Sequence, residues 1–276
     1  MNEISESKDR NIFPLVGSTA LISIYALLNL WVIYLTGPYA WDDGAITLAF
    51  AKTLSENGIF ALTKESEIVE GTSSLLLSFL MAAFHSTFNF TFNGFIEASQ
   101  LFSFMALSVT LILIYQYIRR SIPAVSDRII VIIMFGGMPM FIAENLNGME
   151  MTLFALLITA TVITYEAKSL WLITLVPLLL LVRFEAIFYL TFSFTLLCLI
   201  NKNERGRAAL WGGYAIFVFL ILSYFRWIYF EDVLPNTIWA KMNPPYSDDT
   251  NLFNKSLSKI GGLKEFLTAL DSLRKH

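Results

Sequence analysis

Long apolar runs constrain this chain more than any other feature of its sequence. Residues 15–35 are mostly apolar, and 95–118 and 208–230 are apolar with few polar interruptions. Because the hydrocarbon core of a bilayer is about 30 Å thick, a helix needs about 20 apolar residues to cross it. Composition agrees, since 15% of the 276 residues are charged, against about 25% in ordinary soluble domains. We therefore expect an all-α, polytopic transmembrane helical bundle.

The first apolar run has a second interpretation, a cleavable signal peptide. The run at 15–35 is long, and no small-x-small cleavage pattern follows it. A membrane span is the interpretation that we follow.

Basic residues beside the apolar runs predict the orientation. They cluster at 8–10, 119–128 and 202–207, and short loops rich in Lys and Arg tend to face the cytoplasm. With these clusters inside, the segments rich in acids fall outside, the N-terminus is cytoplasmic and the C-terminal tail is outside. Seven crossings are predicted, at 15–35, 95–118, 129–143, 150–167, 169–183, 186–200 and 208–230.

One apolar segment does not fit this alternation. If 72–87 crossed the membrane fully, Arg119 and Arg120 would lie outside. We therefore predict a short oblique helix at 72–87. Residues 1–242 then form the transmembrane module, and 243–276 form an outer loop with an amphipathic tail that lies on the bilayer surface.

The first outer loop begins with two adjacent carboxylates, Asp42 and Asp43. A helix is predicted over 43–56, because Asn57-Gly58 supplies a stop signal, and Asp43 suits its N-cap. Asp42 has no such structural explanation. Two adjacent carboxylates repel, so one of them can titrate high or bind a cation. Either property suits a general base or a metal ligand.

The same predicted helix is amphipathic. Ile46, Phe50 and Leu54 repeat every four residues, whereas Lys52 and Glu56 lie on the other face. We expect the apolar face to lie on the membrane and the charged face in water.

Further polar groups fall on the predicted outer side. Each has a structural explanation: Glu150 can oppose a helix dipole, Arg183 and Glu185 can pair, and Lys241 can reach the interface. Charge at membrane depth is costly and usually marks a site, so their occurrence on one face favours function. The full set of outer candidates is Glu70, Glu150, Arg183, Glu185, Arg226, Asn236 and Lys241.

The other residue types in the chain narrow the choice of catalytic groups. His85 and His276 are the only histidines, so neither a His-based triad nor a His metal cluster is available. No Gly-rich phosphate loop precedes a helix. A carboxylate base with Arg or Lys helpers remains.

Five short motifs, in this order, resemble the polytopic C-class (GT-C fold) glycosyltransferases. The closest pattern is the branch related to mycobacterial terminal arabinofuranosyltransferases, which carries Asp-Asp, Glu-Gly-Tyr-Thr, Gly-Leu-Glu, Arg-Pro-Glu and Leu-Pro-Asn-Thr-Phe-Tyr-Ala-Lys. Thr72, Met149 and Phe184 depart from that pattern. The family often continues into further spans and an outer domain, so the resemblance makes 243–276 a shortened C-terminal region. The matching segments are Trp41–Ile46, Glu70–Ser73, Asn147–Glu150, Arg183–Glu185 and Leu234–Lys241.

The resemblance implies transfer of a sugar from a polyprenyl-phosphate donor. The acceptor would be a cell-envelope glycan or lipid on the non-cytoplasmic face of a bacterial inner (cytoplasmic) membrane. Membrane lipid is thus a partner, and no nucleic acid is expected. No cofactor is certain; a divalent cation held by Asp42 and Asp43 is left open.

Residue roles follow from matching positions. Asp42 would be the general base, with Asp43 orienting it or holding the cation. Arg183 and Lys241 would stabilise the departing phosphate, with Arg226 as a third candidate. The remaining substrate-binding candidates, which would shape the sugar site, are Glu70, Glu150, Glu185 and Asn236.

Two other classes of function stay open. A lipid-carrier transporter or an accessory subunit could keep the same fold without catalysis. A transporter should carry charges or broken helices at mid-membrane, and the inner halves of the predicted spans are nearly free of acids. A plain structural membrane protein explains the hydrophobicity but not the one-sided polar motifs.

Overall fold

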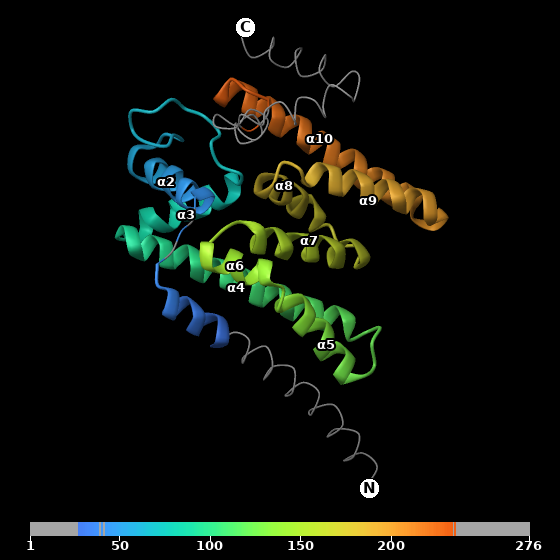
Figure 1. The fold of residues 1–276 in the computed structure, drawn as a ribbon. Helices are drawn as coiled ribbons and strands as arrows, with labels where there is room; N and C mark the ends of the chain where they lie inside the picture. Colours follow the sequence, from blue (N-terminus) through green and yellow to red (C-terminus); the bar gives the residue numbers. More distant parts are fainter. Residues whose placement is uncertain (1–26, 39, 41, 234, 236–276) are drawn as a thin grey trace, which may run out of the picture.

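The computed structural model describes residues 27–38, 40, 42–233 and 235, and in this part every regular element is a helix (Figure 1). Helical residues Leu27–Thr36 come first. One isolated antiparallel bridge joins Ala61 to Ile68. The labelled helices are α2 (Asp42–Asn57), α3 (Leu75–Phe88), α4 (Phe92–Ile118), α5 (Val125–Gly136), α6 (Pro139–Asn147), α7 (Met151–Glu166), α8 (Leu172–Val182), α9 (Ala186–Ile200) and α10 (Arg205–Phe230), with a 3-10 turn η1 (Lys202–Glu204) before α10.

Two helices are long and apolar enough to cross a membrane. They are α4, with 27 residues, and the continuous helical stretch Lys202–Phe230, with 29. The pair α5 and α6 meets the same criterion only when its two helices are taken together, and it is bent by 49°. The described part is therefore all-helical, with two or three helices that could span a membrane.

The bend between α5 and α6 corrects the prediction of one continuous span over 129–143. Helix α5 ends at Gly136, and α6 begins at Pro139. Proline lacks a backbone N–H and disfavours helical geometry in the residue before it. Met138 accordingly has φ −59° and ψ 123°, so the helix breaks there.

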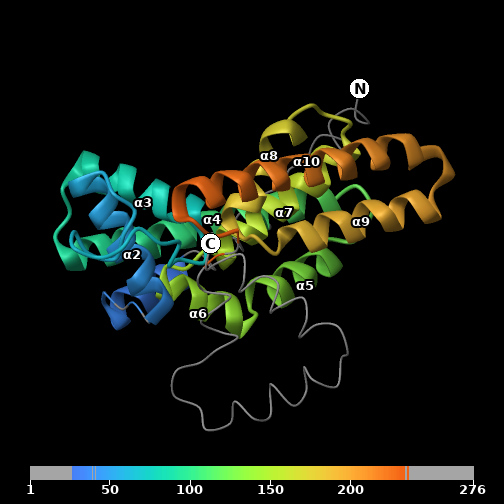
Figure 2. The ribbon, with the colours of Figure 1, turned by 90° about the horizontal axis from the view of Figure 1, so that it is seen from above.

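Three shorter apolar helices lie between α4 and α10. Helices α7, α8 and α9 have 16, 11 and 15 residues, which correspond to about 24, 16 and 22 Å. Their bounds agree closely with the predicted segments. They pack with α10 around a core that includes Leu157, Leu179, Leu190 and Ala215. Figure 2 shows α9 and α10 side by side. Crossing of the membrane by all three stays a prediction.

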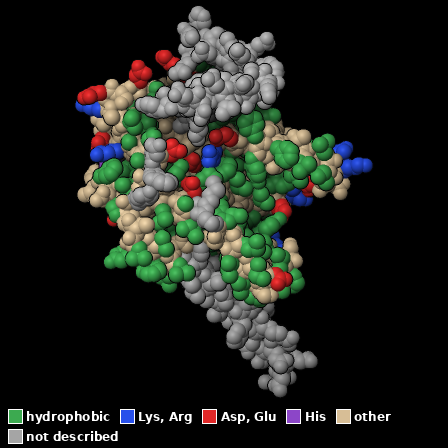
Figure 3. Space-filling model, in the orientation of Figure 1, with side chains coloured by type: hydrophobic (Ala, Val, Ile, Leu, Met, Phe, Trp, Pro, Cys, Tyr) green, Lys and Arg blue, Asp and Glu red, His purple; other side chains and the backbone are tan. Residues whose placement is uncertain are grey.

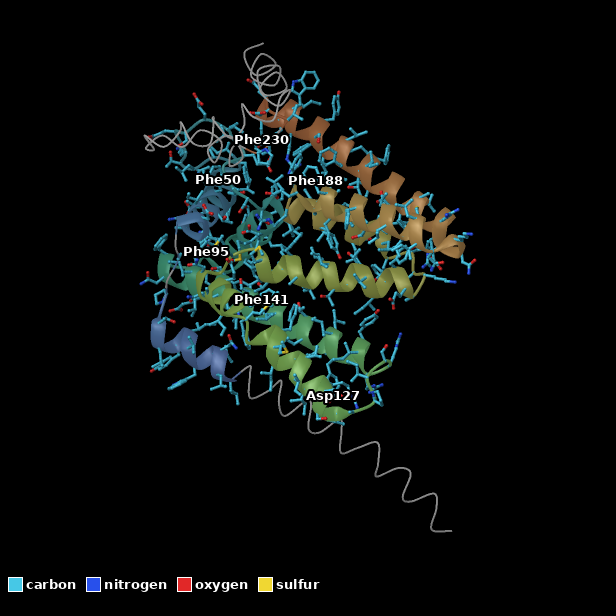
Figure 4. All side chains as sticks on the ribbon, turned by 45° about the vertical axis from the view of Figure 1, so that its right-hand side comes forward. Phe50, Phe95, Asp127, Phe141, Phe188 and Phe230 are labelled. Carbon is cyan, nitrogen blue, oxygen red and sulfur yellow. The ribbon has the colours of Figure 1, made fainter. Side chains whose placement is uncertain are left out.

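Helix α2 was predicted correctly, but its apolar face packs inward and not on the membrane. Phe50 is buried against Phe60, and Phe60 against Phe230 of α10, with Ile46 and Leu54 beside them. Figure 4 labels Phe50 and Phe230 near each other at this end. The charged face of α2 is exposed, as expected.

A short helix was predicted at 72–87, and α3 confirms it. Its oblique orientation in the membrane stays a prediction. It has 14 residues, and its N-cap Ser74 accepts a hydrogen bond from the Leu77 backbone N–H at 3.2 Å. It packs against α2 and α8. At about 21 Å, it is shorter than a bilayer core.

The helices bring the predicted cytoplasmic charges to one end. Tyr117 donates a hydrogen bond to Glu166 at 2.5 Å, and Tyr165 donates to Glu204 at 3.3 Å, so the end of α4, the end of α7 and the start of α10 meet. We call this the basic end, defined by Arg119, Arg120, Lys168, Lys202, Arg205 and Arg207. The opposite, acidic end is defined by Asp43, Glu70, Glu144, Glu150 and Glu185.

This segregation of charge generates a topology prediction. In a background where the single Cys198 is replaced by Ser, a cysteine at Ser66 should react with a membrane-impermeant thiol reagent in intact cells. A cysteine at Ser121 should react only after the membrane is permeabilised, because the basic end should face the cytoplasm. Labelling of Ser121→Cys in intact cells would overturn the seven-span arrangement.

Candidate functional site

The first and third motifs touch at the acidic end. A Cβ atom added at Gly44 of α2 would lie 2.8 Å from the backbone oxygen of Asn147, so only glycine allows this approach. Gly148 caps α6 with φ +63°, and a Cβ there would collide with Ser99 of α4. The glycines of both motifs therefore hold the start of α2 beside the turn that leads into Glu150.

Arg183 lies between two carboxylates. Its Nη1 is 3.7 Å from Oε1 of buried Glu150, and its Nε is 3.7 Å from Oε2 of exposed Glu185. The expected pairing of Arg183 with Glu185 is thus confirmed, and Glu150 is added to it. Both distances exceed the usual hydrogen-bond range of about 2.7–3.2 Å. Nη1 donates instead to Met151 Sδ at 2.8 Å, which is a weak acceptor. The guanidinium, 24% exposed, therefore keeps donor capacity for an anion.

Two carboxylate oxygens at this end have no hydrogen-bond partner in the described part. They are the buried Oε2 atoms of Glu150 and Glu144. The charges of Glu150, Arg183 and Asp43 all act on Glu144, so these groups form one electrostatic cluster. Glu144 was not among the candidates predicted from the sequence. The only sign of it there was an acidic residue directly after the predicted span 129–143. Figure 3, in the orientation of Figure 1, shows acidic and basic side chains next to one another on the face in view, with hydrophobic side chains beside them.

A buried ion pair between Glu70 and Arg226 also lies at the acidic end. Arg226 Nε and Nη2 donate to the two oxygens of Glu70 at 2.6 and 3.0 Å, and both residues are buried. The guanidinium also stacks over the ring of Phe184, 4.8 Å from its centroid. Burial raises the pKa of the Glu70 carboxyl above its ordinary value, and the hydrogen bonds and charge of Arg226, which stabilise the ionised form, offset only part of this effect.

This pair has a positioning role in the conformation described here. Glu70 and Arg226 were predicted to bind substrate, but their charged atoms are bonded to each other. Through Phe184, Arg226 supports the segment that carries Arg183 and Glu185. Sequence reasoning noted both charges and missed their pairing, because 156 positions separate them.

The remaining candidates are only partly described. Asn236, Lys241 and the side chain of Asp42 lie outside the described residues. Helix α2 begins at Asp42, so Asp43 is inside the first turn and exposed, which corrects its predicted role as N-cap. A carboxylate in that turn still favours the helix through its dipole. Among the described residues, no group of three or more His, Cys, Asp or Glu could hold a metal ion.

Comparisons with known proteins add no family to this geometry. A scan against protein-family models, a search of curated proteins and a search of solved structures each found no match to the chain. The resemblance to GT-C glycosyltransferases depends on the five motifs. Three of them are linked by described contacts: Gly44 with Asn147, and Glu150 with Arg183.

The ion pair generates a stability prediction. Arg226→Met should lower the free energy of unfolding by roughly 3–5 kcal/mol, because it leaves a buried, unpaired carboxylate. Lys52→Met removes one partner of the exposed Lys52–Glu56 pair and should change it by at most about 1 kcal/mol. Unfolding in mixed detergent micelles measures both. Equal effects of the two variants would contradict the role of the pair, and the double variant Glu70→Leu with Arg226→Met should recover part of the loss.

Proposed function

We propose that this chain is a membrane glycosyltransferase that moves a sugar from a polyprenyl-phosphate-linked donor to a cell-envelope glycan or lipid on the non-cytoplasmic face. One observation carries the proposal. Arg183, with uncommitted donors, lies at the acidic end of an apolar helical protein beside carboxylates with unpaired oxygens. A charged cluster at such a boundary usually marks a site.

The cluster can bind both the phosphate and the sugar of such a donor. A planar guanidinium recognises phosphate through paired hydrogen bonds, and it stabilises the charge that grows on the departing phosphate. The unpaired Oε2 atoms of Glu144 and Glu150 can accept hydrogen bonds from sugar hydroxyls. Anion and sugar recognition thus come from neighbouring groups.

The base is assigned to Asp42, at the start of α2. Contact of Gly44 with Asn147 supports this assignment, since it brings the start of α2 close to the Glu150 turn. In the proposed reaction, the acceptor hydroxyl oxygen attacks the anomeric carbon and the bond from that carbon to the phosphate oxygen breaks. The polyprenyl phosphate leaves with the bonding electrons, and Asp42 takes the hydroxyl proton. Asp43, the next residue in sequence, is exposed and orients Asp42 or holds a cation.

The proposal keeps the GT-C-like arrangement of seven spans with the acidic end outside. Helices of about 22–24 Å, such as α7 and α9, match a bilayer only where it is locally thinned. Thinning would bring a lipid-linked donor close to Arg183.

The break between α5 and α6 favours a second candidate, a lipid-carrier transporter of the same fold. Transporters bind substrate at broken helices near mid-membrane, and α5 and α6 meet at 49°. The discriminating property is chemistry: a transporter moves the lipid-linked sugar intact, whereas a transferase cleaves it.

The base assignment predicts a difference between neighbouring residues. Asp42→Asn keeps the volume and most hydrogen bonding, so transfer by membranes with matched expression should fall by about 10² to 10⁴ from loss of general-base catalysis. Asp43→Asn is the neighbouring comparison: it removes the orienting carboxylate but keeps the base, so transfer should fall by much less than in Asp42→Asn. Near-normal transfer by Asp42→Asn would reject the assignment, and inactivity of Asp43→Asn alone would move the base by one residue.

The phosphate assignment predicts a donor-specific defect. Arg183→Lys keeps the charge but loses the planar fork, so KM for the lipid-linked donor should rise about tenfold while KM for the acceptor stays unchanged. Lys64→Gln, which removes an exposed cation before α3, is the control and should leave both values as they are. A change in the acceptor KM alone would exclude Arg183 as the phosphate ligand.

A further inference from the structure

A cavity lies toward the opposite, basic end, away from the proposed transfer site. It has a volume of about 410 Å³ and lies between the last turns of α7 and the side of α9 that runs from Tyr189 to Asn201. This size falls within the range of about 300–1,000 Å³ that is usual for ligand sites. Its charged or aromatic polar lining residues are Tyr165, Glu166, Lys168, Tyr189, Glu204 and Arg207.

The acids in this lining are already engaged. Glu204 Oε2 accepts from Arg207 Nη2 at 2.6 Å and from the Tyr165 hydroxyl at 3.3 Å. Arg207 also stacks over the Tyr165 ring, 4.1 Å from its centroid. Glu166 accepts from the Tyr117 hydroxyl. The acids therefore stabilise the walls of the cavity.

Two cations that line this cavity keep donors that no described hydrogen bond uses. One is Arg207, whose Nε and Nη1 are buried without a hydrogen-bond partner in the described part. The other is Lys168, which is exposed and takes part in none of the described ion pairs. Lys168 is the cation that a ligand can reach from outside. Its backbone has φ +54°, a left-handed conformation that normally favours glycine after a helix. A lysine at this position supplies a cation at a conformational cost, and such a cost is typical of functional positions.

Apolar side chains line the rest of the cavity. They are Val162 of α7 and Leu190, Phe194 and Leu197 of α9. Phe188 and Phe192 lie on the opposite face of α9, about half a helical turn away, and line a separate, open hollow. Both are largely exposed, as expected for side chains that face lipid, and Figure 4 labels Phe188 near the start of α9.

We propose that the cavity binds one anionic phospholipid of the cytoplasmic leaflet. Its phosphate lies at Lys168, and one acyl chain enters the apolar part of the cavity between α7 and α9. Two features favour this occupant: a cation at the end that the positive-inside tendency assigns to the cytoplasm, and apolar side chains that line the same cavity. Basic pockets between helices on that side suit anionic lipid head groups.

Native mass spectrometry of the purified full chain tests the proposal. Phosphatidylglycerol, phosphatidylethanolamine and polyprenyl phosphate are added separately and in competition. Phosphatidylglycerol should be retained most strongly. Lys168→Gln should weaken its binding about tenfold, since a charge-assisted hydrogen bond is lost. Lys202→Gln, an exposed lysine at the same end that does not line the cavity, is the matched control and should bind as the natural chain does.

A second variant tests the cavity itself. Ser193 lines it, so Ser193→Phe should fill it and abolish retention, while circular dichroism and the midpoint of unfolding confirm that the helices remain. Equal binding by Lys168→Gln and Lys202→Gln, full retention by Ser193→Phe, or preference for phosphatidylethanolamine would overturn the proposal. Displacement of phosphatidylglycerol by polyprenyl phosphate would assign the cavity to the carrier lipid instead. These readouts need no sugar transfer, so they stand or fall separately from the transferase proposal.

Discussion

The buried ion pair between Glu70 and Arg226 is the interaction on which the acidic end depends. Two charges removed from water are tolerated only when both partners are correctly placed, and here the partners come from the segment before α3 and the last turns of α10. Stacking of Arg226 on Phe184 extends that constraint to the segment between α8 and α9. The pair thus holds together elements far apart in the sequence, and Arg183 lies at their junction.

The helices also separate the charged side chains between the two ends of the molecule. Apolar helices fill the middle of the molecule, acids and two arginines lie at one end, and most other basic side chains lie at the opposite end. A bilayer favours this arrangement, because charge is costly at mid-membrane. The two ends can then serve the two functions proposed above: recognition of a lipid-linked sugar at the acidic end and of a cytoplasmic-leaflet lipid at the basic end.

Local sequence patterns predicted much of the fold but could not predict the long-range contacts between helices. Apolar periodicity and the Asn57-Gly58 stop signal gave α2 almost to the residue, but could not reveal that Phe50 packs on Phe60 and not on lipid. The break before Pro139 was readable in principle, since proline disfavours a helix interior. In the candidate site, Arg183 with Glu185 followed from proximity in sequence. The bond from Arg226 to Glu70 and the position of Glu144 depend on how distant helices pack.

Transfer as proposed requires that the acidic end binds a polyprenyl phosphate. Photo-crosslinking measures this binding, with a polyprenyl phosphate that carries a photoreactive group beside the phosphate and with the labelled peptides mapped by mass spectrometry. Labels within 144–151 and 183–187 are expected, and unlabelled polyprenyl phosphate should compete with them. Labels confined to the basic end, at 166–168 or 201–207, or no competable label on folded protein, would contradict the proposed binding.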